Sequence, residues 1–195
     1  MNNEKPIPLK LPQSIYAQTE SPTKDDIEFE MVVGRLVFIL QDTEQGIRFC
    51  ESIVFNPKGD QISTDVFRSD KRSLGRLVEK LKQKTSLDAD FQSTLEAFVN
   101  NRNILIHRVA EQPWWEARIQ GQFAGAFTFL GQLMDQAEIV KLTFEAVIFD
   151  YMQNRFSIDE TNEALEPFKK SGYLDAVKAH LEFSRDAIKK SGPQT

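Results

Sequence analysis

Residues 98–108, with the sequence FVNNRNILIHR, place three chemically capable side chains in a largely apolar stretch: Arg102, Asn103 and His107. An imidazole titrates near neutral pH, so it can take a proton from a ribose 2′-hydroxyl or give one to a leaving 5′-oxygen. A guanidinium can bind non-bridging phosphate oxygens through paired hydrogen bonds and stabilise the added negative charge. These residue types therefore suit cleavage of an RNA phosphodiester without a metal ion or cofactor.

The spacing of the three residues sets limits on how they could cooperate. On a helix, Asn103 and His107 are four residues apart and share one face. Arg102 is five residues from His107, about 140° around the helix, so the two cannot form an ideal pair on one face, although they can flank one edge of a groove. One chain offers one histidine in this motif. Two copies facing each other would supply two.

At these residues the sequence resembles the HEPN superfamily, whose members carry an arginine, often followed by a polar residue, and then a histidine after four to six intervening residues. The residues that match are Arg102, Asn103 and His107, and the context is similar in the segments LGRLV (74–78) and LEAFV (95–99). The resemblance covers residues 26–150.

The resemblance implies an all-α bundle that forms a homodimer, with the motifs lining a shared cleft. It also implies a ribonuclease or RNA-binding protein of a toxin–antitoxin or phage-defence system, with a cognate antitoxin or partner protein. In that case Arg102 would bind phosphate, His107 would act as general acid or base, and Asn103 would orient one of them.

A purely structural interpretation of the same residues stays open. Arg102 could form an ion pair with Glu96 or with an acid on another helix, and Asn103 could bond to a neighbouring loop. The chain would then be a non-catalytic helical module for protein–protein interaction. Its partner surface would come from the long apolar segment after Pro113 and from the Trp114–Trp115 pair, of which at least one ring is expected to seal a joint between helices or an interface.

A basic stretch precedes the motif, within residues 68–84, and carries a local charge of about +5 in a chain whose net charge is −5. Beside the motif, it could guide an RNA backbone; otherwise it is a solvated helix face. The RNA-binding candidates are Arg72 and Arg76 in this stretch and Arg108 directly after the motif. The other basic residues of the stretch are Arg68, Lys71, Lys80, Lys82 and Lys84.

The apolar spacing predicts an all-α, antiparallel helical bundle with long helices and no strand. Asp25 or Asp26 is expected to cap the first helix and Ser73 the second. The helix over 114–153 is either continuous or broken near residues 135–138. The expected helices are 25–55, 74–85, 87–110 and 114–153, then a short one from Asp159 or Thr161 to Gly172 and a last one over 173–190.

Three regions are expected: an extended or disordered arm over 1–24, the HEPN-like bundle over 25–153, and C-terminal helices over 154–195 that pack on the bundle or extend it. The arm holds four of the chain's 8 prolines. No apolar run reaches the roughly 18 residues that span a bilayer, so no membrane association is expected.

The remaining chemistry-bearing residues are expected to be structural. The single cysteine, Cys50, lies in an apolar helical stretch and is interpreted as a core residue in a reducing, cytoplasmic compartment. His180 has no partner motif and is expected at the surface. The two histidines lack metal-ligand spacing, so no metal site is expected.

Overall fold

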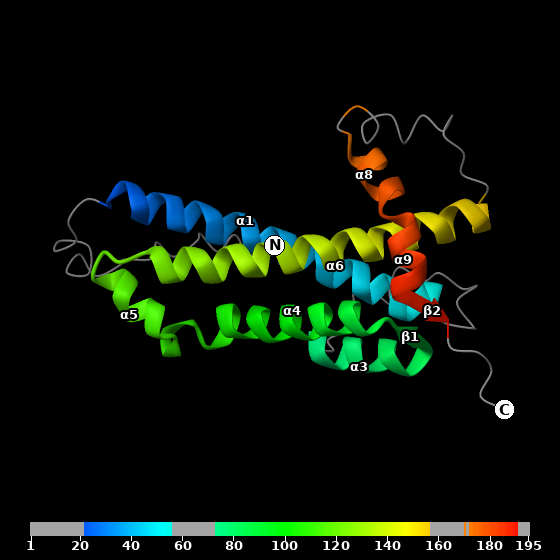
Figure 1. Cartoon of the computed structure of the whole chain (residues 1–195), viewed down its shortest axis with the longest axis horizontal. Coiled ribbons are helices and arrows are strands. Elements are labelled where there is room, and N and C mark those ends of the chain that lie inside the picture. Colours follow the sequence, from blue (N-terminus) through cyan, green and yellow to red (C-terminus); the bar gives the residue numbers. More distant parts are fainter. Residues whose placement is uncertain (1–21, 56–72, 157–169, 171, 191–195) are drawn as a thin grey trace, which may run out of the picture.

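Helices build almost the whole of the structure, a computed structural model that describes residues 22–55, 73–156, 170 and 172–190 (Figure 1). The all-α fold class is confirmed. The elements in chain order are α1 (Lys24–Phe49), a π-helical turn (Cys50–Val54), α3 (Leu74–Lys84), β1 (Thr85–Leu87), α4 (Ala89–His107), a 3-10 turn (Val109–Glu111), α5 (Pro113–Ile119), α6 (Ala124–Phe156), α8 (Tyr173–Ala179), α9 (Leu181–Ala187) and β2 (Ile188–Lys190).

The first helix begins one residue earlier than predicted, because Thr23 caps it. The Thr23 hydroxyl accepts a hydrogen bond from the Asp26 backbone N–H at 3.1 Å, and the Thr23 N–H donates to the Asp26 carboxylate at 3.0 Å. This reciprocal pair is a capping box. The prediction that Asp25 or Asp26 is the cap was therefore wrong, although Asp26 contributes the second half of the box.

The two long helices α1 and α6 run parallel, and α4 runs antiparallel to both. The ring of Phe29 lies 6.1 Å from that of Phe123 near the starts of α1 and α6. Cys50, just after α1, lies 3.8 Å from the carbonyl of Phe144 further along α6. The contacts of α4 run the other way, from Phe91–Phe144 to Asn101–Gln136.

The predicted helix over 114–153 is broken, but near its start rather than near residues 135–138. Gly121 adopts a φ of +80°, which an L side chain rarely adopts, and its N–H bonds to the carbonyl of Arg118 at 2.8 Å. The chain therefore turns after α5, and α6 starts afresh at Ala124. From there it continues for 33 residues without interruption.

The predicted last helix over 173–190 is also divided. It breaks at His180 between α8 and α9, and residues 188–190 form β2 instead of helix. β2 pairs antiparallel with β1, with Thr85 opposite Lys190 and Leu87 opposite Ile188. The prediction of no strand was wrong here because three residues are too few to show an alternating pattern. Most of the short helix predicted from Asp159 or Thr161, and the arm over 1–24 up to residue 21, lie outside the described residues.

The core fills the space between α1, α4 and α6. Its largest fully buried side chains include Phe91, Phe98 and Phe144, and burial of each such side chain contributes about 1.5–3 kcal/mol. Cys50 is completely buried, as predicted, and burial raises the pKa of its thiol. None of the described helices combines the length and apolar character needed to cross a membrane.

Candidate functional site on α4

The helix α4 carries all three motif residues and is held firmly at its start. The Asp88 carboxylate caps it by accepting hydrogen bonds from the N–H groups of Asp90 and Phe91 at 2.9 and 3.3 Å. One face, which includes Phe98 and Leu105, is buried. His107 is the last residue of the helix, and Arg108 leaves the helical conformation with a φ of −135°.

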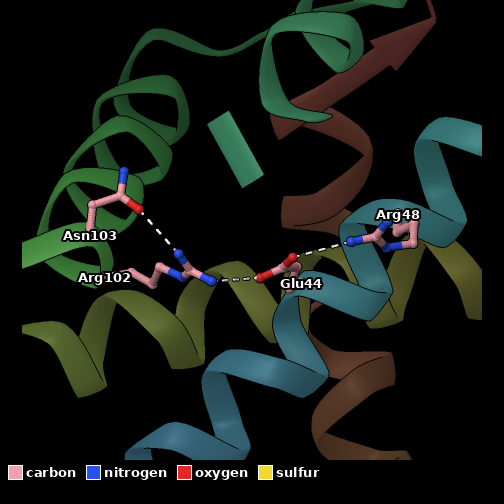
Figure 2. Close-up of polar contacts among 4 residues, drawn as sticks. All are labelled: Glu44, Arg48, Arg102 and Asn103. Carbon is pink, nitrogen blue, oxygen red and sulfur yellow. Dashed lines mark hydrogen bonds and ion pairs between the residues drawn. The ribbon is translucent and has the colours of Figure 1, made fainter. Parts of the chain in front are cut away.

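Arg102 points from α4 toward α1 and is held there by two oxygen acceptors (Figure 2). One terminal nitrogen, Nη2, donates to Oε2 of Glu44 at 3.1 Å, and the other, Nη1, donates to Oδ1 of Asn103 at 3.2 Å. The Glu44 carboxylate uses its other oxygen, Oε1, to accept from Nη2 of Arg48 at 3.2 Å. One carboxylate therefore bridges two guanidinium groups, and this set carries a net charge of +1.

The bridging group is largely withdrawn from solvent. The side chains of Arg48, Glu44 and Arg102 keep 6%, 19% and 22% of their exposure. Charges in such surroundings need partners, because desolvation otherwise costs several kcal/mol per ion. Glu44 thus fixes the direction of the Arg102 side chain, which is buried only in part.

The structural interpretation of Arg102 is partly confirmed by this contact. Arg102 does form an ion pair with an acid on another helix, and that acid is Glu44. Glu96 instead accepts a 2.7 Å hydrogen bond from Lys82, and this bond holds the pKa of Glu96 below its usual value.

Glu44 and Arg48 were not predicted as site residues. Their spacing of four residues on one helix is the usual signature of an ion pair, but it does not indicate which third group will join them.

His107 is not brought together with Arg102. Its side chain is exposed and makes no hydrogen bond or ion pair within the described part of the chain. On a regular helix it lies about 180° from the buried Phe98, and about 140° and 7.5 Å along the axis from Arg102. The structure therefore joins Arg102 to Asn103 and presents His107 to solvent at the end of α4.

The basic stretch is partly neutralised where the structure describes it. Lys82 binds Glu96, and Lys84 donates at 2.7 Å both to the carboxylate and to the backbone carbonyl of Glu51. Arg76 is exposed, as is Arg108 directly after His107. Of the other basic residues in the prediction, Arg68, Lys71 and Arg72 lie outside the described residues.

The prediction that His180 is a surface residue was wrong. Its Nε2 lies 3.0 Å from the Thr143 hydroxyl, which itself donates to the carbonyl of Ile139, so the imidazole N–H is the donor to Thr143. The ring lies 4.7 Å from that of Phe183, and partial burial lowers the pKa of His180. This histidine packs between α6 and the C-terminal helices, away from the α4 motif.

The tryptophan pair takes the sealing role expected of it. The Trp114 ring stacks on Phe129 at 5.1 Å and joins α5 to α6. The guanidinium of Arg118 lies over Trp115, 4.3 Å from the ring centre.

The polar groups around α4 suit phosphate binding and proton transfer. Throughout the described ranges, no group of three or more His, Cys, Asp or Glu side chains is placed to hold a metal ion.

Comparisons with protein-family models, with curated proteins and with solved structures found no match to this chain.

Proposed function

We propose that this chain is a HEPN-like, metal-independent endoribonuclease or RNA-binding protein whose site is formed by Arg102, Asn103 and His107. The observation that carries the proposal is the combination of a solvent-open imidazole and a guanidinium held in a fixed direction on the same helix. His107 is exposed at the last turn of α4, and Arg102 is held by Glu44 and Asn103.

In this proposal Arg102 binds the phosphate. A guanidinium has five N–H donors, and the hydrogen bonds to Glu44 and Asn103 use two of them. The remaining donors can bind non-bridging phosphate oxygens. Because Glu44 is also bonded to Arg48, its negative charge is shared between two cations, and the cluster keeps a positive charge for an anionic ligand.

His107 carries the proton transfer. The neutral imidazole accepts the proton of the 2′-hydroxyl, whose oxygen attacks the adjacent phosphorus, and an acid protonates the departing 5′-oxygen. The products are a 2′,3′-cyclic phosphate and a 5′-hydroxyl end. A second copy of the chain would supply the second histidine, so a homodimer is part of the proposal. The proposal also includes a cognate antitoxin or other partner protein, a role in phage defence and a cytoplasmic location.

The decisive experiment is an RNA cleavage assay in EDTA with the wild type, His107→Ala and His180→Gln. The chain has two histidines, so His180→Gln controls for the loss of an imidazole away from α4. We expect cleavage by the wild type and by His180→Gln, with 2′,3′-cyclic phosphate ends, and none by His107→Ala. The thermal unfolding of His107→Ala should be unchanged, because the side chain is exposed. Equal cleavage by all three proteins would refute the assignment.

One observation favours a second function, that of a non-catalytic interaction module. The Arg102–Glu44 pair gives the arginine a structural partner within the chain, and α1 exposes large apolar side chains at Ile27, Met31 and Phe38. If the wild type cleaves none of a panel of RNAs and does not bind them, this second function is the better conclusion.

A further inference from the structure

The outer face of α1 carries an apolar stripe that none of the residues described by the structure covers. Ile27, Met31, Gly34 and Phe38 follow one another at intervals of four, three and four residues, which places them on one side of the helix. Ile27, Met31 and Phe38 are 47%, 70% and 70% exposed. The opposite side, which includes Leu36, faces the core.

Gly34 lies in the middle of this stripe, where the described residues give no steric reason for a glycine. A Cβ added at Gly34 would meet nothing within 4 Å, and the backbone there is ordinary helix. A glycine inside a helix costs about 1 kcal/mol relative to alanine. The absence of a side chain at Gly34 leaves a gap between Met31 and Phe38. A side chain from a closely packed partner helix can fill such a gap.

We propose that the stripe on α1 binds the same stripe on a second copy of the chain, with the two helices antiparallel around a twofold axis. In this pairing Met31 of each copy lies over Gly34 of the other, so the long side chain fills the gap that the glycine leaves. Phe38 lies opposite Ile27. Packing large residues against small ones across facing positions gives an interface without voids.

A groove on α1 matches the place where Phe38 of the second copy would insert. Lys24, Ile27, Glu28 and Met31 line it, together with Val32 and Arg35, and its volume is about 410 Å³. The first four have the spacing of the hole that receives a single side chain in knobs-into-holes packing. The pairing uses this hole once in each copy.

The charges beside the stripe are self-complementary in the antiparallel arrangement. Glu28 and Arg35 lie on the same edge, seven residues apart, and both are exposed. Antiparallel pairing with Met31 opposite Gly34 places Glu28 of one copy beside Arg35 of the other, and the twofold axis produces this contact twice. Parallel pairing would instead stack Gly34 on Gly34 and leave a void. It would also turn Arg35 toward Glu30.

This surface is separate from the α4 motif. The first half of α1 and the helix α4 lie on opposite sides of α6 (Figure 1). Pairing through α1 is therefore a different interface from the homodimer of the proposed function, which must bring two His107 side chains together near α4. A wild type that dimerises through α1 but cleaves no RNA would contradict the proposed function alone, and a dimer that cleaves RNA and is left intact by Met31→Glu would contradict the α1 pairing alone.

The first test measures the mass of the full chain by sedimentation over a range of protein concentrations. The variants are Met31→Glu, Gly34→Leu and the control Ile119→Glu, which puts the same charge on another exposed apolar residue, 66% exposed on α5. We expect a dimer for the wild type and the control, and a dissociation constant at least about a hundredfold higher for the other two variants. Gly34→Leu should leave thermal unfolding of the monomer unchanged or higher, since its side chain has open space.

The second test determines the direction of the pairing. Arg35→Glu should weaken the dimer, and adding Glu28→Arg in the same chain should restore it. Rescue by Glu30→Arg instead would contradict the antiparallel arrangement. A wild type that stays monomeric at the highest concentration, or a dimer that Met31→Glu leaves intact, would overturn the proposal.

Discussion

Nη2 of Arg102 on α4 lies 3.1 Å from Oε2 of Glu44 on α1, and this contact joins the two helices (Figure 2). The same carboxylate binds Arg48, which is almost fully buried. The geometry of the candidate site thus depends on a residue 58 positions away in the sequence.

Replacing Glu44 should therefore destabilise the fold as well as disturb the site. Glu44→Gln removes the negative charge between two withdrawn guanidinium groups, and we expect a loss of about 1–3 kcal/mol in the free energy of unfolding. Chemical denaturation would measure it. The control is Glu138→Gln on the exposed side of α6, which should change stability by less than about 0.5 kcal/mol. An equal loss of unfolding free energy in Glu44→Gln and Glu138→Gln would mean that the bridge between the two arginines does not stabilise the fold.

RNA binding under the proposed function should depend on the exposed Arg76 of α3 and on Arg108, which follows α4. We expect Arg76→Gln and Arg108→Gln each to weaken binding for all sequences and to reduce the slope of log affinity against log salt by about 1. A fluorescence titration of labelled RNA at several salt concentrations would measure this. Lys189→Gln on β2 is a control of the same charge change, and it should leave the slope as in the wild type. If Lys189→Gln reduced the salt slope as much as the arginine variants do, the RNA would be attracted by the charge of the protein in general rather than by a site near α4.

His180 should make stability depend on pH in a defined direction. Its folded-state pKa lies below the ordinary histidine value of about 6.5, because burial disfavours the charged ring. The unfolded state therefore takes up the proton first as pH falls. The stabilising effect of the neutral ring is fully present above about pH 6.5 and is lost as pH falls through the folded-state pKa.

Urea unfolding at about pH 7.5 and about pH 5.5 would test this dependence. The wild type should lose more stability between the two values than His180→Gln, whose side chain does not titrate. Other titrating groups contribute the same pH dependence to both proteins, so the difference between the two proteins isolates His180. An identical pH dependence in the two proteins would show that the lowered pKa has no effect on folding.

Two glycines of α6 should respond to alanine in opposite directions. A Cβ on Gly125 would lie 3.0 Å from the Cβ of Trp114, so Gly125→Ala must push α5 and α6 apart and should cost about 1 kcal/mol. Gly131 has nothing within 4 Å, and Gly131→Ala should gain about 0.5–1 kcal/mol through helix propensity. Thermal unfolding of the two variants compares them directly, and a gain at Gly125 would show that the α5–α6 contact adapts freely.

The sequence was sufficient to predict the helical class and the positions of α3 and α4 within a few residues. Local signals account for this success. Ser73 stands at the N-cap position of α3, although its side chain makes no capping hydrogen bond, and the apolar spacing around Phe98 defines the buried face of α4. The capping box at Thr23 has an equally local signal that the prediction assigned to the wrong residue.

Features that depend on packing could not be predicted in the same way. The positive φ of Gly121 and the break at His180 become favourable because the segments after them pack on the core. The three-residue strands gain stability from each other across the chain rather than from their own sequence. For the site, the sequence indicated that Arg102 could pair with an acid of another helix. Only the arrangement of α1 beside α4 identifies that acid as Glu44.

The parallel course of α1 and α6 has a consequence for how the chain acquires its structure during synthesis. The contact between Cys50 and Phe144 joins residues 94 positions apart. The hydrogen bonds of β1 can form only after residues 188–190 have been synthesised. A chain emerging from the ribosome can form α3 and α4 early, but α1 has to keep its apolar face unburied until most of α6 has been made. Nascent chains arrested before residue 144 should therefore bind general chaperones through α1, and longer ones should be released from them.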